Sequence, residues 1–436
     1  MQDRELPWWK EPTRAQWAAF VAAWSGWVLD AFDFVIFGLV AAELMKEFGV
    51  GLTAIGGSIT LTLLVRLLGG FVAGWMADRW GRKLPLMLSL LWFAAFDAAI
   101  AFAPTFTAVL VLRTLFGFGM GAEWTAGTAL AMENWPARSR KIASGMLQAG
   151  WPIGFFLAAT VYAAVVPTWG WRALFVIAAV PALLVIPIRF MVPDEVSKVA
   201  AADRAKAVSL ADLMVPEVRR MLILGTLVMA LGFIVYYALT AHYMAMLRVE
   251  LLLGPSEAAF DQRLFNLGML TGVIGAGWFA NRFGVVKALT IPALLMVPAL
   301  PLYVGVVPAA LPIGAFLGGM LGVGYSGVTP VLTTSLFPGH VRARAIGIVY
   351  HAGALFAAFV PTLIGELSKT SLKISGSIAV IAGAGLVSMS TAIILLRRRI
   401  VLPAVTSAAP PSAAPPQPEA AARAAATASE RGAQYA

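Results

Sequence analysis

The sequence predicts an all-α membrane protein with twelve transmembrane helices arranged as two six-helix bundles. The chain is 60% hydrophobic and only 12% charged. It contains repeated apolar windows, each about 20 residues long, which is the length of helix that crosses about 30 Å of hydrocarbon. A polar stretch at residues 74–83 recurs at 277–284, an offset of 203 positions. A duplicated membrane protein with a short basic hinge after the second span of each half is typical of secondary transporters.

The apolar windows set the predicted spans, and the segments between them set the predicted domains. The first six spans are residues 17–42, 52–76, 84–102, 106–132, 142–166 and 171–191. The second six are residues 221–247, 264–279, 288–307, 311–336, 345–367 and 374–396. The window at 264–279 is the least regular, because Asp261, Arg263 and Asn266 crowd its start. The predicted domains are a cytoplasmic N-terminal segment (1–16), an N-terminal bundle (17–192), a linker (193–220), a C-terminal bundle (221–398) and a disordered cytoplasmic tail (399–436).

The formal charge of +10 follows the predicted membrane topology. On one side of the predicted membrane we count 24 Lys and Arg residues, and on the other side six. Because cytoplasmic loops carry the excess of basic residues, both termini are expected in the cytoplasm of a multi-pass inner-membrane protein, with no nucleic-acid partner. The first apolar run is long enough to span, so we expect no cleavable signal peptide.

Composition also limits the chemistry. The chain contains no Cys and three His, which excludes disulfides and thiolate metal sites and makes metal chemistry poor. We find no Ser-His-Asp set, phosphate loop or metal-ligand cluster in the predicted cytoplasmic segments. The expectation is therefore a monomer that is not an enzyme and has no cofactor other than a proton gradient.

Two motifs show the internal repeat and resemble a known family. The hinge 74–83 and its copy form the first motif, and 135–145 aligns with 337–347 at an offset of 202. The hinge resembles the signature of the major facilitator superfamily between helices two and three, and Arg113, Gly117 and Gly119 resemble that of its fourth helix. The resemblance covers residues 15–400 and implies that superfamily's fold, with the substrate site between the two bundles.

The hinge residues predict a conformational latch. Gly74 permits close helix approach, Asp78 can cap the next helix or pair with Arg82, and Gly81 permits a tight turn. By resemblance, Glu133 is the acidic partner that locks the hinge. An ordinary basic loop is the alternative. In the second copy of the hinge, Asn281 stands at the position equivalent to Asp78, and Val285 at the position equivalent to Arg82.

Charged residues inside the predicted spans are the main functional candidates. Each would cost about 3 kcal/mol at a helix centre, so these groups must pair or line water. They are Asp30, Asp33, Arg66, Asp97, Arg113 and Glu123. Asp30 and Asp33 are three positions apart and share a helix face. Structural ion pairs, such as Asp33 with Arg66, are the alternative.

The residue types suggest a division of roles. Arg66 and Arg113 are predicted to bind the substrate, because a guanidinium group matches a carboxylate bidentately. Asp30, Asp33 and Glu123 are predicted to carry the coupling proton, because a carboxyl group in a low-dielectric cavity can titrate near neutral pH. Four more side chains are predicted to line the substrate route, with helix contacts as the alternative. They are Gln148, Tyr236, Tyr325 and His351.

A closer resemblance suggests the transported compound. Residues 29–34, 121–124 and 169–175 are similar to the sialate and lactate proton-symporter branch. This implies proton-coupled import of an organic carboxylate, either a short monocarboxylate or a sugar acid such as sialic acid. Only a polar linker joins the halves, whereas sialic acid carriers often have extra membrane segments there, which favours a smaller acid. The alternatives are a drug or metabolite exporter of the same superfamily and a membrane enzyme or receptor; the run 150–154 lacks the longer antiporter pattern.

Overall fold

The computed structural model describes residues 7, 9–81, 83–133, 135–136, 140–179, 183, 188, 190, 192, 210–337 and 341–400. The chain divides into two compact units, Met1–Leu396 and Arg397–Ala436. The first unit contains the predicted N-terminal bundle and all but the last two residues of the predicted C-terminal bundle. The predicted domain boundaries stay predictions, and the predicted tail from residue 401 onward lies outside the described residues, as does most of the linker.

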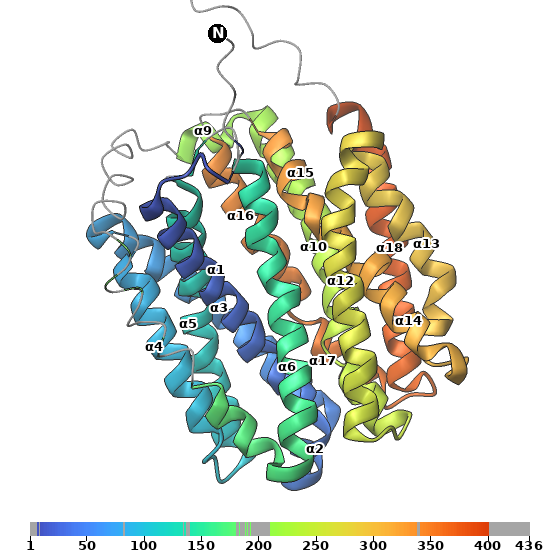
Figure 1. Cartoon of the computed structure of the whole chain (residues 1–436). Helices are drawn as coiled ribbons and strands as arrows, with labels where there is room; N and C mark the ends of the chain where they lie inside the picture. The colour runs from blue at the N-terminus through green and yellow to red at the C-terminus, as the bar shows by residue number, and fades with distance from the viewer. Residues whose placement is uncertain are drawn as a thin grey trace, which may run out of the picture. The chain divides into compact units, whose positions relative to one another are not determined.

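The N-terminal half is built from long helices and the short helix α2 (Figure 1). They are α1 (Arg14–Leu39), α2 (Ala41–Phe48), α3 (Leu52–Trp80), α4 (Lys83–Ile100), α5 (Phe106–Glu133) and α6 (Arg140–Ile177). Helix α1 begins with a capping box, in which the Thr13 hydroxyl and the Gln16 side chain each accept a hydrogen bond from the other residue's backbone N–H. Helix α6 is interrupted at Gly170, whose φ of 75° lies in the left-handed region, so the predicted fifth and sixth spans separate there.

The C-terminal half contains more interruptions. Its elements are α9 (Leu210–Met214), α10 (Pro216–Thr240), α11 (Tyr243–Ala245), η3 (Met246–Glu250), α12 (Pro255–Phe283), α13 (Val285–Tyr303), η4 (Pro308–Ala310), α14 (Leu311–Leu317), η5 (Gly318–Val323), η6 (Gly324–Val328), α15 (Thr329–Leu336), α16 (Arg342–Ala357), α17 (Val360–Leu367) and α18 (Lys373–Ile400). The predicted span 311–336 is therefore a broken helix, with π-helical and 3₁₀ turns in its middle. Such irregular turns are common at functional sites.

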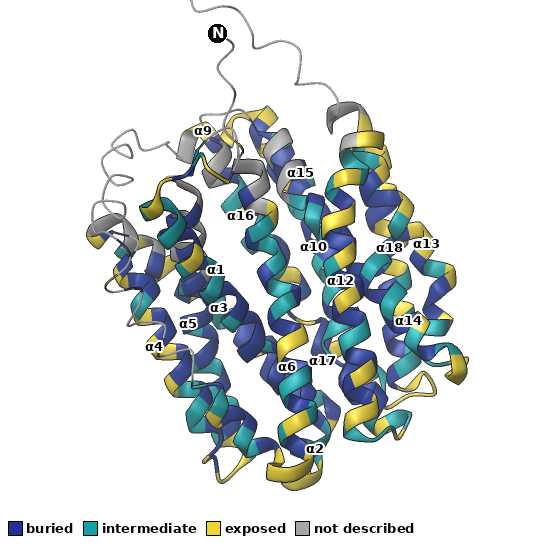
Figure 2. Ribbon diagram, viewed as in Figure 1, coloured by how far each residue is buried: buried dark blue, intermediate teal, exposed yellow. Residues whose placement is uncertain are grey.

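The described helices agree with the predicted all-α membrane fold. Ten segments among the described residues are long and apolar enough to cross a membrane, and each matches a predicted span. The remaining two spans differ for separate reasons. Helix α12 contains the predicted span 264–279 together with the polar residues noted above. The predicted span 171–191 is described continuously only as far as residue 179. Figure 2 shows exposed residues on the outer faces of the helices. Large apolar side chains are among the exposed residues, and Phe71 and Leu395 are 81% and 77% exposed, as expected of a protein whose surface contacts lipid.

Small residues let helices α3 and α5 pack closely. Cβ atoms added at Gly117 and Gly121 would lie 2.3 Å and 1.8 Å from the carbonyl oxygens of Thr62 and Arg66. The two glycines are four residues apart, as in the small-residue motif of packed membrane helices. This contact fixes the position of the α3 backbone at Arg66.

The repeat seen in the sequence is also present in the backbone. Gly81 and Gly284 occupy equivalent positions of the duplicated hinge and have φ values of 87° and 86°. Each directly follows a long helix, α3 in the first half and α12 in the second. Only glycine adopts such φ values readily, so the hinge glycines have the same structural role in both halves.

The two halves meet at the end of the bundle where α2 lies, opposite to the start of α1 (Figure 1). We call this the α2 end. There the Thr60 hydroxyl lies 2.7 Å from the carbonyl oxygen of Ala358 and 2.8 Å from the Thr362 hydroxyl. A Cβ atom added at Gly56 would lie 2.4 Å from the carbonyl oxygen of Pro361. Helices α3 and α17 are therefore in backbone contact, and the α2 end is closed.

Candidate functional site

A cavity lined by residues of both halves lies between them. Aromatic side chains make up much of its wall, and a few polar groups interrupt them. The lining residues used below are Trp27, Arg66, Gln148, Trp151, Tyr236 and Tyr325. A cavity lined mainly by apolar and aromatic side chains, with few polar groups, is typical of a small-molecule site.

Arg66 is the charged residue of this cavity among the described lining residues. Its Nη2 atom lies 4.0 Å from an Asp30 carboxylate oxygen and is buried, with no hydrogen-bond partner in the described part of the chain. Arg66 also lines a smaller adjoining cavity, together with Tyr237, Tyr350 and His351. The guanidinium group is thus held by the N-terminal half and faces aromatic residues of the C-terminal half.

A hydrogen bond joins the halves at the cavity wall. The indole Nε1 of Trp151 donates to the Tyr236 hydroxyl at 2.5 Å. The Trp151 ring also packs on Trp27, with 4.5 Å between ring centroids. One turn earlier on α6, the Gln148 side chain has a buried Oε1 atom that no described donor satisfies. The Tyr325 hydroxyl donates to the backbone carbonyl oxygen of Gly232 at 2.5 Å and is thereby fixed.

The three predicted proton-carrying acids are buried in the N-terminal half. Asp30 and Asp33 are 0% exposed and Glu123 is 1% exposed. Within the described residues, none of the Asp30 and Asp33 carboxylate oxygens accepts a hydrogen bond, and the same holds for Oε2 of Glu123. The other Glu123 oxygen lies against helix α1, where a Cβ atom added at Gly26 would approach it to 2.7 Å. Arg66 interacts electrostatically with Asp30 and Glu123. The ion pair of Asp33 with Arg66, named above as the alternative, is not among the described contacts, because Arg66 lies beside Asp30 instead.

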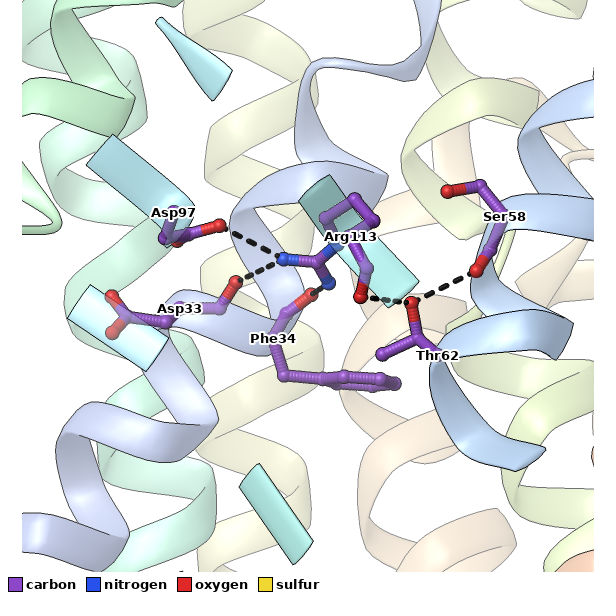
Figure 3. A network of polar contacts seen from close by, with 6 residues as sticks. All are labelled: Asp33, Phe34, Ser58, Thr62, Asp97 and Arg113. Atoms are coloured by element: carbon purple, nitrogen blue, oxygen red, sulfur yellow. Dashed lines mark hydrogen bonds and ion pairs between the residues drawn. The ribbon is translucent and has the colours of Figure 1, made fainter. Parts of the chain in front are cut away.

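Arg113 is held in a buried network that includes Asp97 and the backbone of Asp33 and Phe34 (Figure 3). Its Nη1 atom donates to Asp97 at 3.1 Å and to the backbone carbonyl oxygen of Asp33 at 3.2 Å, and its Nη2 atom donates to that of Phe34 at 3.2 Å. The rings of Phe37 and Phe116 lie 4.8 Å and 4.1 Å from the guanidinium carbon. Arg113 is 0% exposed and lines neither cavity. The placement differs from the sequence-based expectation of a substrate contact, because Asp97 and backbone carbonyls already use the guanidinium group.

The predicted latch is only partly described. Gly74 and Asp78 lie in the last turns of α3, Gly81 forms the left-handed turn described above, and Glu133 is the last residue of α5. The side chains of Asp78 and Glu133, and the whole of Arg82, lie outside the described residues. The latch therefore stays a prediction.

Sequence reasoning left Trp27 and Trp151 out of the site. A spacing signal was available, because Gln148, Trp151 and Pro152 fall on one face of α6 and line the cavity together. The pairing of Trp151 with Tyr236 had no local signal, since the two residues are 85 positions apart. No group of three or more His, Cys, Asp or Glu side chains in the described ranges is placed to hold a metal ion.

A cavity between two repeated helical halves, with charged groups buried at membrane depth, defines a secondary transporter. Residues 22–261 match the Major Facilitator Superfamily, and the chain belongs to this family. It is an integral membrane transporter and not an enzyme.

Curated relatives cover most of the chain. A "Probable 4-methylmuconolactone transporter" of Cupriavidus pinatubonensis is 30% identical over 83% of this chain and 86% of its own length. A "Cis,cis-muconate transport protein" of Acinetobacter baylyi is 28% identical, covering 86% and 91% of the two chains. The "Sialic acid transporter NanX" of Escherichia coli is 27% identical, covering 83% and 89%. Among solved structures, a D-xylose-proton symporter matches with a TM-score of 0.69 at 18% identity, over 88% of this chain and 97% of its own, which shows the shared fold.

Proposed function

We propose that this protein imports an organic carboxylate together with protons, by alternating access around the central cavity. The observation that carries the proposal is that Arg66 lines the aromatic cavity, while its buried Nη2 atom has no hydrogen-bond partner among the described residues. An unsatisfied buried guanidinium donor is costly. A bound carboxylate would satisfy it with strong charge-assisted hydrogen bonds.

The cavity wall favours an acid with a planar, unsaturated body. Trp27, Trp151 and Tyr236 line the cavity with aromatic side chains, against which such a body can pack. Gln148 offers a hydrogen-bond acceptor for a hydroxyl group elsewhere on the ligand. The muconate, methylmuconolactone and sialic acid named for three relatives support a carboxylate of this size over a short monocarboxylate such as lactate.

Charge balance in the N-terminal half supports proton coupling. Four buried carboxyl groups share this core with two guanidinium groups. They are Asp30, Asp33, Asp97 and Glu123, beside Arg66 and Arg113. Burial strongly disfavours uncompensated charge, so the cluster is close to neutral only when about two of the acids hold a proton. We assign these protons to Asp30, Asp33 and Glu123, because Asp97 is paired with Arg113.

Asp30 links the proton to the substrate. It lies 4.0 Å from Arg66, close enough to compete with a substrate carboxylate for the same guanidinium group. Protonation of Asp30 would free Arg66 for the substrate, and substrate binding would in turn favour the protonated acid. This reciprocal preference is the coupling that symport requires.

The distribution of basic residues supports cytoplasmic termini. Because the α2 end lies opposite to the start of α1, the α2 end then faces the outside of the cell. The conformation described is then closed towards the outside. Rocking of the two halves would separate α3 from α17 and expose the cavity to the external substrate.

Two measurements test the proposal. A thermal-shift screen of the purified protein against mono-, di- and nine-carbon sugar acids, cis,cis-muconate included, identifies the ligand class. The acid that stabilises the protein most is then followed into proteoliposomes with and without an inward proton gradient. We expect stabilisation that disappears in Arg66→Ala and uptake that the gradient accelerates. Stabilisation retained in Arg66→Ala would remove Arg66 from the site, and gradient-independent flux would show a uniporter.

A further inference from the structure

Arg248 lies in an irregular turn between α10 and α12, at the α2 end. The turn is π-helical, with the Leu251 N–H donating to the carbonyl oxygen of Met246 at 3.0 Å. Leu252 follows with a φ of 57°, a left-handed conformation that bulky residues rarely adopt. Strained backbone and π-helical turns both concentrate at functional sites.

The turn itself holds one side of the Arg248 guanidinium group. Nη1 donates to the carbonyl oxygen of Leu253 at 2.7 Å, within the C-terminal half. Nη2 donates to Oε1 of Glu43 in the N-terminal half at 3.1 Å. Nε is buried and has no hydrogen-bond partner among the residues the structure describes. The guanidinium group therefore has unused capacity on the side that faces the other half.

Glu43 is likewise anchored in its own half. The Tyr162 hydroxyl, on α6, donates to the same Oε1 atom at 3.0 Å. Oε2 of Glu43 is buried, and no described group donates to it. The contact between the carboxylate and Arg248 thus uses one oxygen, although a guanidinium group and a carboxylate can form two parallel hydrogen bonds.

Separation of the halves would break only the hydrogen bond between Arg248 and Glu43 in this group of contacts. Glu43 would leave with Tyr162, and Arg248 would stay with Leu253, because these bonds lie within each half. An unpaired guanidinium group would then lie at the open mouth, on the route by which an external anion reaches the cavity. Its earlier partner was a carboxylate, so the geometry already suits one.

We propose that Arg248 is a second carboxylate-binding site, which Glu43 occupies while the α2 end is closed and the incoming organic acid occupies once it opens. This site rests on the proposed function, since its ligand is the transported acid. It is separate from the cavity of Arg66 and acts before the substrate reaches that cavity.

The proposal is tested by comparing the transport kinetics of two variants, Arg248→Gln and Glu43→Gln. The probe is the acid that stabilises the wild-type protein most in the screen above. Its KM is measured for uptake into intact cells and into inverted membrane vesicles. These two preparations present opposite faces of the protein to the acid, so a KM is obtained for each face without knowing the orientation in advance. Arg248→Gln should raise the KM about tenfold from the α2 end, as expected for one lost charge-assisted hydrogen bond. Glu43→Gln should lower the KM from that end, because it removes the competing carboxylate.

The controls distinguish a carboxylate-binding site at Arg248 from an ion pair that only holds the two halves together. In both variants the KM from the opposite face and the thermal stabilisation by the acid should be unchanged, because the Arg66 cavity is intact. If the pair only holds the halves together, both variants change the KM in the same direction, and the second site is overturned. An unchanged KM in Arg248→Gln would overturn it as well. If the wild-type protein neither binds nor transports any acid of the panel, the proposed function fails instead.

Discussion

Trp151 and Tyr236 form a hydrogen bond of 2.5 Å that joins the two halves of the protein at the wall of the central cavity. Trp151 lies on α6 of the N-terminal half, where it packs against Trp27, and Tyr236 lies on α10 of the C-terminal half. A ligand that touches both residues would sense the relative position of the halves.

This hydrogen bond can be measured by a double-mutant cycle. Trp151→Phe and Tyr236→Phe each keep an aromatic ring but remove the bond, and each should cost about 1 kcal/mol of stability. The double variant should cost little more than either single variant, since the bond can be lost only once. Thermal unfolding of the four purified proteins checks this, and additive losses would show that the two side chains act independently.

Substitution of Gly121 should disturb the whole α3–α5 contact. A Cβ atom there would lie 1.8 Å from the carbonyl oxygen of Arg66, which is backbone and cannot move alone. We expect Gly121→Ala to lower the melting temperature strongly and to weaken acid binding through Arg66. Gly57→Ala is the matched control on α3, because nothing lies within 4 Å of its added Cβ atom. It should leave stability unchanged or raise it by up to about 1 kcal/mol through helix propensity; a normal melting temperature in Gly121→Ala would contradict the close packing.

The Arg113–Asp97 pair should act mainly on stability. Asp97→Ala leaves a fully buried guanidinium group without its carboxylate partner, a change that typically costs about 3–5 kcal/mol. The double variant Arg113→Leu with Asp97→Ala should recover part of this loss, because no uncompensated charge remains. Melting temperatures in detergent give the comparison. A double variant less stable than Asp97→Ala alone would argue against the pairing.

Closure of the α2 end can be trapped covalently. The chain contains no cysteine, so Thr60→Cys with Thr362→Cys introduces one isolated pair where the hydroxyl oxygens lie 2.8 Å apart. Oxidation should stop transport, and a reductant should restore it, because α3 and α17 must separate in each cycle. Either single-cysteine variant should be insensitive to oxidant. Full transport by the oxidised pair would show that this contact persists throughout the cycle.

Glu47 should give a small pH-dependent contribution outside the predicted spans. Its partial burial acts to raise the pKa, but hydrogen bonds from Trp171 and Arg172 and the Arg172 charge outweigh this and lower the pKa from its ordinary value of 4.5. A depressed folded-state pKa adds stability above the unfolded pKa, and this stability is lost as pH falls through the folded value. Glu47→Gln should therefore cost about 0.5 kcal/mol at pH 7, as for an exposed pair, and its melting curve should converge with that of the wild type as pH falls below 4.5. A constant difference across this range would contradict the assignment.

The sequence determined the class of fold because its signals are local. A span needs only a run of apolar residues, and the duplicated hinge needs only two similar segments, so both could be read without knowing which helices touch. Gly81 shows this well, since a tight turn was predicted there from the sequence and Gly284, its equivalent in the repeat, has nearly the same φ. The buried charges could also be listed in advance, because any ionisable residue within an apolar window must find a partner or water.

Only the tertiary structure decided how those charges are shared. Arg66 and Arg113 look equivalent in the sequence, yet Arg66 faces the cavity beside Asp30, whereas Arg113 is enclosed by Asp97 and two backbone carbonyl groups. The difference depends on which helix faces meet, and glycines such as Gly121 set that through contacts between residues far apart in the chain. Contacts such as Trp151–Tyr236 and Glu43–Arg248 join residues 85 and 205 positions apart. Helical periodicity carries no information about these pairings, because it describes one helix at a time.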